Sequence, residues 1–164
     1  MKILSTLSPD KKRRIPAIDR SFLEPIGELT VNFAMLEQAV AHGIWHLVSD
    51  DQYLGTILTS ELSFRRKVET LSCLHLYRYP GADPSVFKAL AAKLYQLEEK
   101  RNTFIHSYWG RDPKSSEIAR MKTTAKAKGL SSQLEIVSRE TIVEIALRMA
   151  EVARELEIFY DSFT

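Results

Sequence analysis

Three long stretches of this sequence repeat apolar residues at spacings of three and four, which is the period of an amphipathic helix. We expect these helices over about residues 20–47, 84–109 and 139–163, with shorter helices over 52–58 and 63–77. Each amphipathic helix buries one apolar stripe, and stripes of this length need a shared core. The sequence therefore predicts an all-α fold, a four- to five-helix bundle.

The segment before the last expected helix has a different pattern. Residues 118–124 and 133–137 are candidates for two short strands, with residues 127–129 in the turn between them. Their alternation of apolar and polar residues is poor, so an ordered or mobile loop remains the alternative. We expect a small β-hairpin or a loop inserted before the last helix.

The chain is expected to form one domain behind a short lead-in. A length of 164 residues suits one core, and neither an internal repeat nor a linker divides the sequence. Residues 1–18 are expected to be a flexible basic lead-in, because they contain the run Lys11-Lys12-Arg13-Arg14. Residues 19–164 are expected to form the single helical bundle.

Composition places the chain among soluble globular proteins. Hydrophobic residues make up 45% and charged residues 27% of the sequence, and no apolar run approaches membrane-spanning length. The only cysteine, Cys73, cannot form a disulfide within the chain, so we expect a cytoplasmic protein. The net charge of +2 is too small to indicate nucleic-acid binding by itself, so any basic surface must be local.

Arg101 interrupts the apolar stripe of the helix expected over residues 84–109. A fixed cation in an apolar seam costs free energy unless it is paired or used, and such breaks are expected at functional sites. Asn102 and His106 are four residues apart and share a face on the flank of this stripe. The stripe itself consists of Leu90, Leu94, Leu97, Phe104 and Tyr108.

Arg101 and His106 together suggest acid–base chemistry on a phosphodiester. An imidazole can take or give a proton, while a guanidinium stabilises the extra negative charge on the reacting phosphorus. RNA needs no metal for this reaction, because its own 2′-hydroxyl can be the nucleophile. The structural alternative is that Arg101 pairs with Glu37 inside the bundle. Spacing alone favours this alternative, because buried ion pairs also make a site look special.

Other chemistries have weaker signals. His42 and His46 lie four apart on the first helix and could chelate a metal, but no third ligand is evident. No Gly-x-Ser-x-Gly, Gly-rich phosphate loop or dinucleotide fingerprint occurs. We therefore expect no cofactor and no metal.

The stretch Arg101-Asn102-Thr103-Phe104-Ile105-His106 resembles the Arg-x(4–6)-His motif of the HEPN superfamily, in its Arg-Asn-x-x-x-His form. The resemblance extends to an acidic residue on the first helix, Glu37, and to a lysine on a following helix, Lys67. It also includes an aromatic residue just after the histidine, Tyr108.

The resemblance implies a fold, an activity and partners. HEPN domains are all-helical bundles that usually form homodimers, and many cleave RNA as toxins or defence nucleases. By this resemblance Arg101 and His106 would be catalytic with Asn102 as polar support, while Glu37, Lys67 and Tyr108 would play supporting roles. Other members of the superfamily do not cleave RNA. They serve as interaction modules, so an antitoxin or another partner protein is the alternative.

Five basic residues precede the last expected helix and could hold an RNA backbone. Phosphate contacts of this kind give affinity without sequence selectivity. The basic lead-in could contribute in the same way. The five residues are Lys114, Arg120, Lys122, Lys126 and Lys128.

Overall fold

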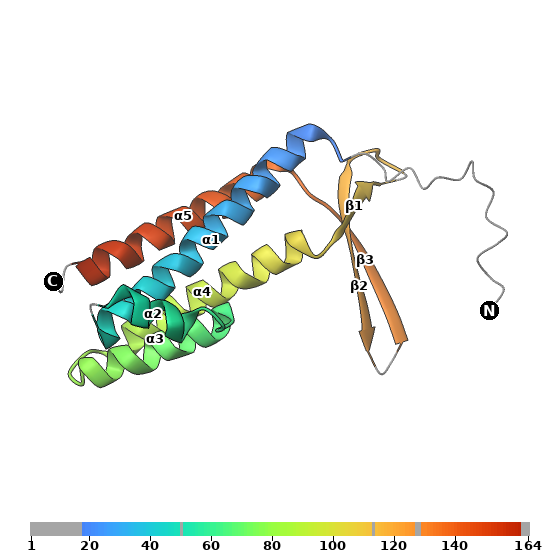
Figure 1. Ribbon diagram of the computed structural model, residues 1–164. Helices are drawn as coiled ribbons and strands as arrows, with labels where there is room; N and C mark the ends of the chain where they lie inside the picture. Colours follow the sequence, from blue (N-terminus) through green and yellow to red (C-terminus); the bar gives the residue numbers. More distant parts are fainter. Residues whose placement is uncertain (1–17, 50, 113, 127–128, 162–164) are drawn as a thin grey trace, which may run out of the picture.

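The computed structural model describes residues 18–49, 51–112, 114–126 and 129–161, so residues 1–17 of the predicted lead-in lie outside the described part. The described part is mostly helical and adds a three-stranded antiparallel sheet before the last helix (Figure 1). The elements are α1 Arg20–Val48, α2 Gln52–Thr59, α3 Phe64–Arg78, α4 Pro84–Ile105, β1 Tyr108–Arg111, β2 Ile118–Lys126, β3 Gly129–Ile136 and α5 Arg139–Asp161.

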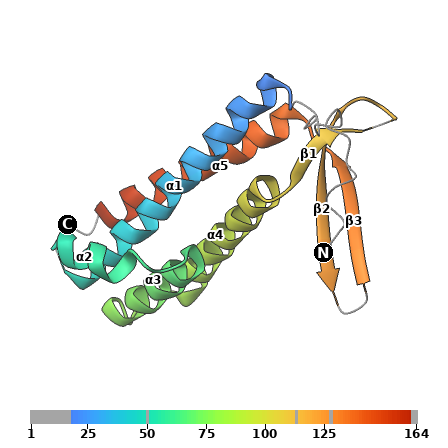
Figure 2. The same cartoon turned by 45° about the vertical axis from the view of Figure 1, so that its right-hand side comes forward.

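The first and last helices run parallel, side by side, in both views (Figures 1 and 2). The Asn32 side chain of α1 donates a hydrogen bond to the carbonyl oxygen of Ala146 in α5, at 2.9 Å. Helix α4 runs in the opposite direction, from the α3–α4 turn to the sheet. The bundle therefore has a turn end and a sheet end, which α4 connects.

The apolar stripes meet in one core, as the helical spacing predicts. Fully buried side chains from α1, α3, α4 and α5 form this core, and they include Leu29, Leu36, Leu71, Leu94, Ile142 and Met149. Each of these side chains contributes on the order of 2 kcal/mol through removal from water. Among the described residues, no helix combines the length and apolar character that a membrane crossing requires.

Side-chain caps fix the ends of the helices where the sequence has Ser or Asp. Asp83 accepts a hydrogen bond from the Ser85 backbone N–H at 2.8 Å and begins α4. Ser138 accepts one from the Thr141 N–H at 3.2 Å just before α5. Such caps satisfy backbone donors that have no partner within the helix.

Helix α4 ends at Ile105, so the prediction that it continues to Trp109 is wrong. Tyr108–Arg111 instead forms β1, in which Tyr108 pairs with Met121 of β2. The Trp109 indole donates to the carbonyl oxygen of Phe104 at 2.9 Å and satisfies a helix-end acceptor. The fold is therefore not all-α, because strand pairing replaces the last helical turn.

The hairpin alternative for the segment before the last helix is confirmed. Strands β2 and β3 pair antiparallel from Ala119 and Ile136 out to Lys126 and Gly129. Gly129 has a φ of +115°, a conformation that residues with a side chain rarely adopt. The outer part of the hairpin projects away from the helices as an arm.

Helix α2 lies against α1 through one tryptophan. The Trp45 indole donates to Thr59 Oγ1 at 2.9 Å, and Thr59 in turn donates to the carbonyl oxygen of Gly55 at 2.8 Å. Gly55 is buried directly against the Trp45 ring. A short helix of this kind needs such contacts, because eight residues are too few for an independently stable helix.

His75 is a buried polar residue at the turn end of the bundle. It is 5% exposed and stacks on Phe87, with ring centroids 4.7 Å apart. Burial disfavours the charged imidazolium and lowers the pKa of His75 below its usual 6.5. The folded protein therefore favours the neutral ring.

Acidification is expected to destabilise the fold through His75. Between the lowered folded-state pKa and the unfolded value of 6.5, the unfolded chain binds more protons than the folded chain. The stability that the neutral His75 ring adds to the fold is therefore fully present above pH 6.5. This stability is lost as the pH falls, by at most about 1.4 kcal/mol per pH unit. Urea unfolding at pH 7.0 and 5.5 would measure it, with His75→Phe as the comparison. An equal loss of stability in both proteins would contradict a buried neutral His75.

Candidate active site

The last turns of α4 line a pocket of about 570 Å³ at the sheet end of the bundle. Asn102, Thr103 and His106 come from α4, and Lys122 comes from β2. The sheet therefore forms one side of this pocket, next to the end of α4. The remaining lining residues are Arg65 of α3 and Glu98 and Glu99 of α4.

His106 caps the end of α4. Its backbone N–H donates to the carbonyl oxygen of Asn102 at 3.1 Å, so the Asn102–His106 pair predicted from their spacing does share one face. The His106 side chain is exposed, and its imidazole makes no hydrogen bond to the residues that the structure describes. Both ring nitrogens are therefore available to a molecule in the pocket.

Arg101 lies beside the pocket and connects to it through Asn102. Its Nη1 donates to Asn102 Oδ1 at 2.9 Å, and its guanidinium carbon lies 5.0 Å from the ring centroid of Phe33. The Nε atom is buried and has no hydrogen-bond partner. Arg101 is not one of the residues that line the pocket. The bond from Arg101 fixes the Asn102 amide, which does line it.

Glu37 pairs with Lys67 and not with Arg101. Lys67 Nζ lies 2.7 Å from Glu37 Oε1 and joins α3 to α1, with Lys67 only 9% exposed. Arg101 forms no ion pair within the described part of the chain. The structural alternative predicted from the sequence is an Arg101–Glu37 ion pair. This alternative is wrong, because Glu37 forms its ion pair with Lys67.

Four residues that line the pocket, Arg65, Glu98, Glu99 and Thr103, are not among the site residues predicted from the sequence. Arg65 stacks on Tyr95, 4.9 Å from its ring centroid, and its Nε lies 3.5 Å from Glu98 Oε2. The charges of Arg65 and Glu98 offset each other, while Lys122 and Glu99 add one charge of each sign. Arg65 follows directly after the Ser63 cap and Phe64, in a run of three basic residues, so only the packing of α3 on α4 distinguishes it.

Side chains alternate between the two faces of the sheet, so the predicted basic residues Arg120 and Lys122 of β2 and the aromatic Tyr108 lie on opposite faces. Side chains two residues apart on a strand share a face, so Arg120 and Lys122 face the helix end. Tyr108 pairs with Met121 on the opposite face and is 55% exposed. Tyr108 therefore does not belong to the pocket, although Lys122 does.

Arg120 fastens the sheet to the helix end. Its guanidinium pairs with Glu135, donates to Ser107 Oγ at 3.3 Å and lies over the Phe104 ring. These contacts leave the Arg120 side chain mostly buried, while its role in RNA binding stays a prediction. Lys114 is exposed in the loop before β2. The Lys126 side chain and all of Lys128 lie outside the described residues.

The two histidines of α1 line a separate small pocket of about 240 Å³. His42 Nε2 lies 2.9 Å from Gln38 Nε2, and His46 packs on Tyr160. Within the described ranges, no group of three or more His, Cys, Asp or Glu side chains could hold a metal ion. The third ligand that a metal at His42 and His46 needs is thus not supplied there.

Comparison with known proteins does not name a family for this chain. No protein-family model matches the sequence, and the comparisons with curated proteins and with solved structures give no match. The resemblance to the HEPN superfamily therefore rests on the residues of the Arg101–His106 stretch and on Glu37 and Lys67.

Proposed function

We propose that this chain is a HEPN-like protein that binds and cleaves RNA as a homodimer, by an acid–base mechanism without metal. The observation that carries the proposal is the open imidazole of His106. It lies in a pocket with Asn102, whose amide oxygen accepts a hydrogen bond from Arg101. A proton-transfer group, an amide and a nearby guanidinium are the groups that phosphodiester cleavage needs.

The proposed reaction uses the RNA itself as nucleophile. The His106 imidazole removes the proton of the ribose 2′-hydroxyl, and the 2′-oxygen attacks the adjacent phosphorus. The bond from phosphorus to the 5′-oxygen breaks, and that oxygen takes a proton from the partner subunit's His106 or from water. The products are a 2′,3′-cyclic phosphate and a free 5′-hydroxyl. Arg101 would stabilise the added negative charge at the phosphorus, with Asn102 orienting the phosphate or His106.

The charges around the pocket constrain how RNA would approach. Lys122 is exposed on the sheet side, whereas Glu98 and Glu99 line the helix side. A phosphate is attracted by Lys122 and repelled by Glu99, so the RNA backbone would enter from the sheet. Lys114 in the loop before β2 would add a sequence-independent phosphate contact there.

Replacing His106 by alanine is expected to lower RNA cleavage by about 100-fold or more, the usual contribution of a positioned acid–base group. The assay uses single-stranded RNA in the presence of EDTA, with product ends identified by mass. The control is His42→Ala, which removes another exposed histidine outside the pocket. A wild-type protein without activity, or equal activity in His106→Ala, would rule out the proposed reaction.

A second candidate function is a non-catalytic interaction module that works through a partner protein, such as an antitoxin. The observation that favours it is the position of Arg101, which packs on Phe33 and lies outside the pocket lining. In that case Arg101 and Asn102 would stabilise the helix end, and His106 would contact the partner. A loss of partner binding in His106→Ala, with no RNA cleavage by the wild type, would support this candidate.

A further inference from the structure

The outer face of α5 carries a groove of about 400 Å³. All the residues that line it come from α5 itself, so no second element of the described chain covers it. Helices pack by placing the side chains of one helix into the grooves of another. The groove therefore has the form of one half of a helix–helix contact. Its lining residues are Leu147, Ala150, Glu151, Arg154, Glu155 and Ile158.

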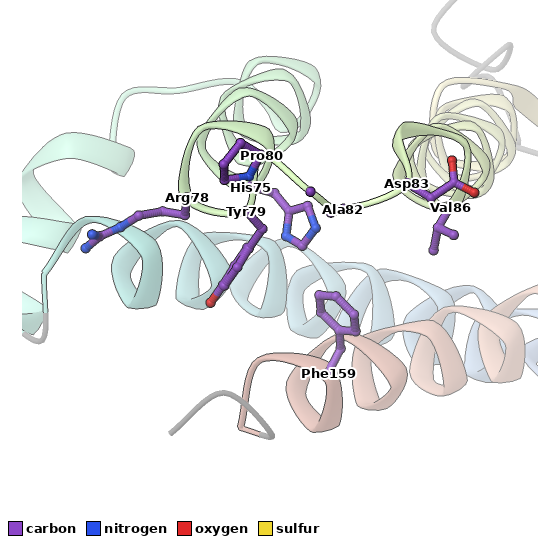
Figure 3. A pocket seen from close by; sticks show the side chains of 9 residues that line it. His75, Arg78, Tyr79, Pro80, Ala82, Asp83, Val86 and Phe159 are labelled. Carbon is purple, nitrogen blue, oxygen red and sulfur yellow. The ribbon is translucent and has the colours of Figure 1, made fainter.

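Two large apolar side chains of this groove face away from the core of the bundle. Leu147 is 51% exposed and Ile158 is 62% exposed, whereas Met149 of the same helix is fully buried. Phe159, next to Ile158, points inward toward His75, with ring centroids 5.6 Å apart (Figure 3). Helix α5 thus has outward apolar residues in addition to its core stripe, and a facing helix would remove them from water.

Arg154 lies between these two apolar residues and has no charged partner. It is exposed and makes no ion pair or hydrogen bond within the described part of the chain. The acidic residues beside it already have other cations: Glu151 pairs with Arg148 at 2.7 Å, and Glu155 lies 3.6 Å from Lys93 of α4. The groove therefore offers a free guanidinium, at its middle, to a carboxylate on the facing helix.

The spacing of the groove residues reads the same in both directions along α5. Four of them are separated by four, three and four positions, which places them on one side of the helix: Leu147, Glu151, Arg154 and Ile158. An antiparallel second copy would set Leu147 opposite the partner's Ile158. It would also set Glu151 opposite the partner's Arg154. An apolar residue then meets an apolar one and a carboxylate meets a guanidinium, which is the self-complementarity that a two-fold interface requires.

The contacts within one chain leave room for these charge pairs. The bond from Arg148 uses only Oε2 of Glu151, so Oε1 can accept a hydrogen bond from the partner's Arg154. Ala150 is small, so it lets a facing helix approach closely. It would lie opposite the partner's Glu155, a residue whose charge Lys93 already offsets.

We propose that α5 is the homodimer interface and packs antiparallel against α5 of a second copy, with the two-fold axis between Glu151 and Arg154. The homodimer belongs to the proposed function, and this inference rests on that part of it and not on RNA cleavage. The charge pattern favours a second copy of this chain over an unrelated protein, because the same face supplies both halves of each ion pair.

This interface keeps the two candidate active sites apart. Lys93 of α4 lies beside Glu155 of the groove, and His106 lies roughly 20 Å further along α4 at 1.5 Å per residue. The two chains run in opposite directions across the axis, so their pockets lie toward opposite ends of the dimer. In the proposed reaction the leaving 5′-oxygen would then take its proton from water and not from the partner subunit's His106.

Arg154→Glu tests the interface, because it sets glutamates opposite each other at both charge pairs. We expect it to weaken dimerisation at least tenfold in analytical ultracentrifugation. The matched control is Arg20→Glu, which makes the same charge change at an exposed arginine at the start of α1, outside the groove. This control should leave the dimer unchanged.

A mixture of two variants tests the pairing itself. Glu151→Arg should weaken the dimer as Arg154→Glu does, because it sets arginines opposite each other. An equimolar mixture of the two variants should form a one-to-one heterodimer, since each chain then meets the opposite charge at both positions. Recovery in the mixture also shows that both variants are folded.

The outcomes separate this interface from the rest of the proposed function. A wild-type dimer that neither variant weakens, an equal loss in Arg20→Glu, or a mixture that does not associate would overturn the α5 interface and leave a homodimer through another face. A monomeric wild type would overturn the homodimer as well, whereas His106→Ala decides RNA cleavage separately. If the wild type cleaves RNA, Arg154→Glu should keep the rate per chain, and a loss of cleavage together with the dimer would contradict separate active sites.

Discussion

The Arg101→Met variant is expected to remain folded and to lose about 100-fold or more of RNA cleavage, the usual cost of removing one group that stabilises the transition-state charge. Methionine matches the length of the arginine stem and can keep the contact with Phe33. The substitution removes a partly buried cation whose Nε has no partner, so stability should change little or rise. Cleavage rates and urea unfolding, measured on the same protein, separate the two roles.

The matched control is Arg66→Met, which removes an exposed arginine that pairs with Glu69 on α3. It should leave cleavage unchanged and cost at most about 0.5 kcal/mol. Two outcomes of Arg101→Met would contradict the expectation. Unchanged cleavage would exclude a role in the reaction, and a loss of stability above about 2 kcal/mol would make Arg101 a structural residue.

Gly55→Ala is expected to destabilise the protein by about 2 kcal/mol. A Cβ atom at Gly55 would lie 2.3 Å from Trp45 Cγ, and the indole cannot move without breaking its hydrogen bond to Thr59. Removing a glycine from a helix gains about 0.5–1 kcal/mol, which is less than the cost of this overlap. Urea unfolding at pH 7 gives the difference directly.

The comparison for Gly55→Ala is Gly27→Ala, in the exposed face of α1. A Cβ atom at Gly27 would meet nothing within 4 Å, so only the helix-propensity gain remains. We expect this variant to be more stable than the wild type by about 0.5–1 kcal/mol. Destabilisation by both substitutions would mean that the Trp45 contact is not the cause.

The helices could be predicted because their signals are local. Apolar spacing placed the three long helices, and Asp83 and Ser138 cap two of their starts. The end of α4 could not be predicted in the same way. Tyr108 continues the helical spacing from Phe104, but it pairs with Met121 in a strand. Pairing partners distant in sequence leave no trace in the local period.

The candidate site was only partly predictable, for a similar reason. The Arg101–His106 stretch is visible in the sequence because a cation there breaks the apolar pattern. Spacing along one helix does not fix the rotation of the next helix. From the sequence, Glu37 could face either Arg101 or Lys67. The packing of α3 on α1 brings Lys67 to Glu37, and the two side chains form an ion pair. The packing of α3 on α4 brings Arg65 into the pocket, which no spacing rule indicates.

The length of α4 determines how substitutions at its two ends combine. The helix has 22 residues and spans roughly 33 Å at 1.5 Å per residue. Arg101 lies near one end and Val86 near the other. Energetic effects at such separations add to within about 0.5 kcal/mol. The two ends can therefore be varied independently.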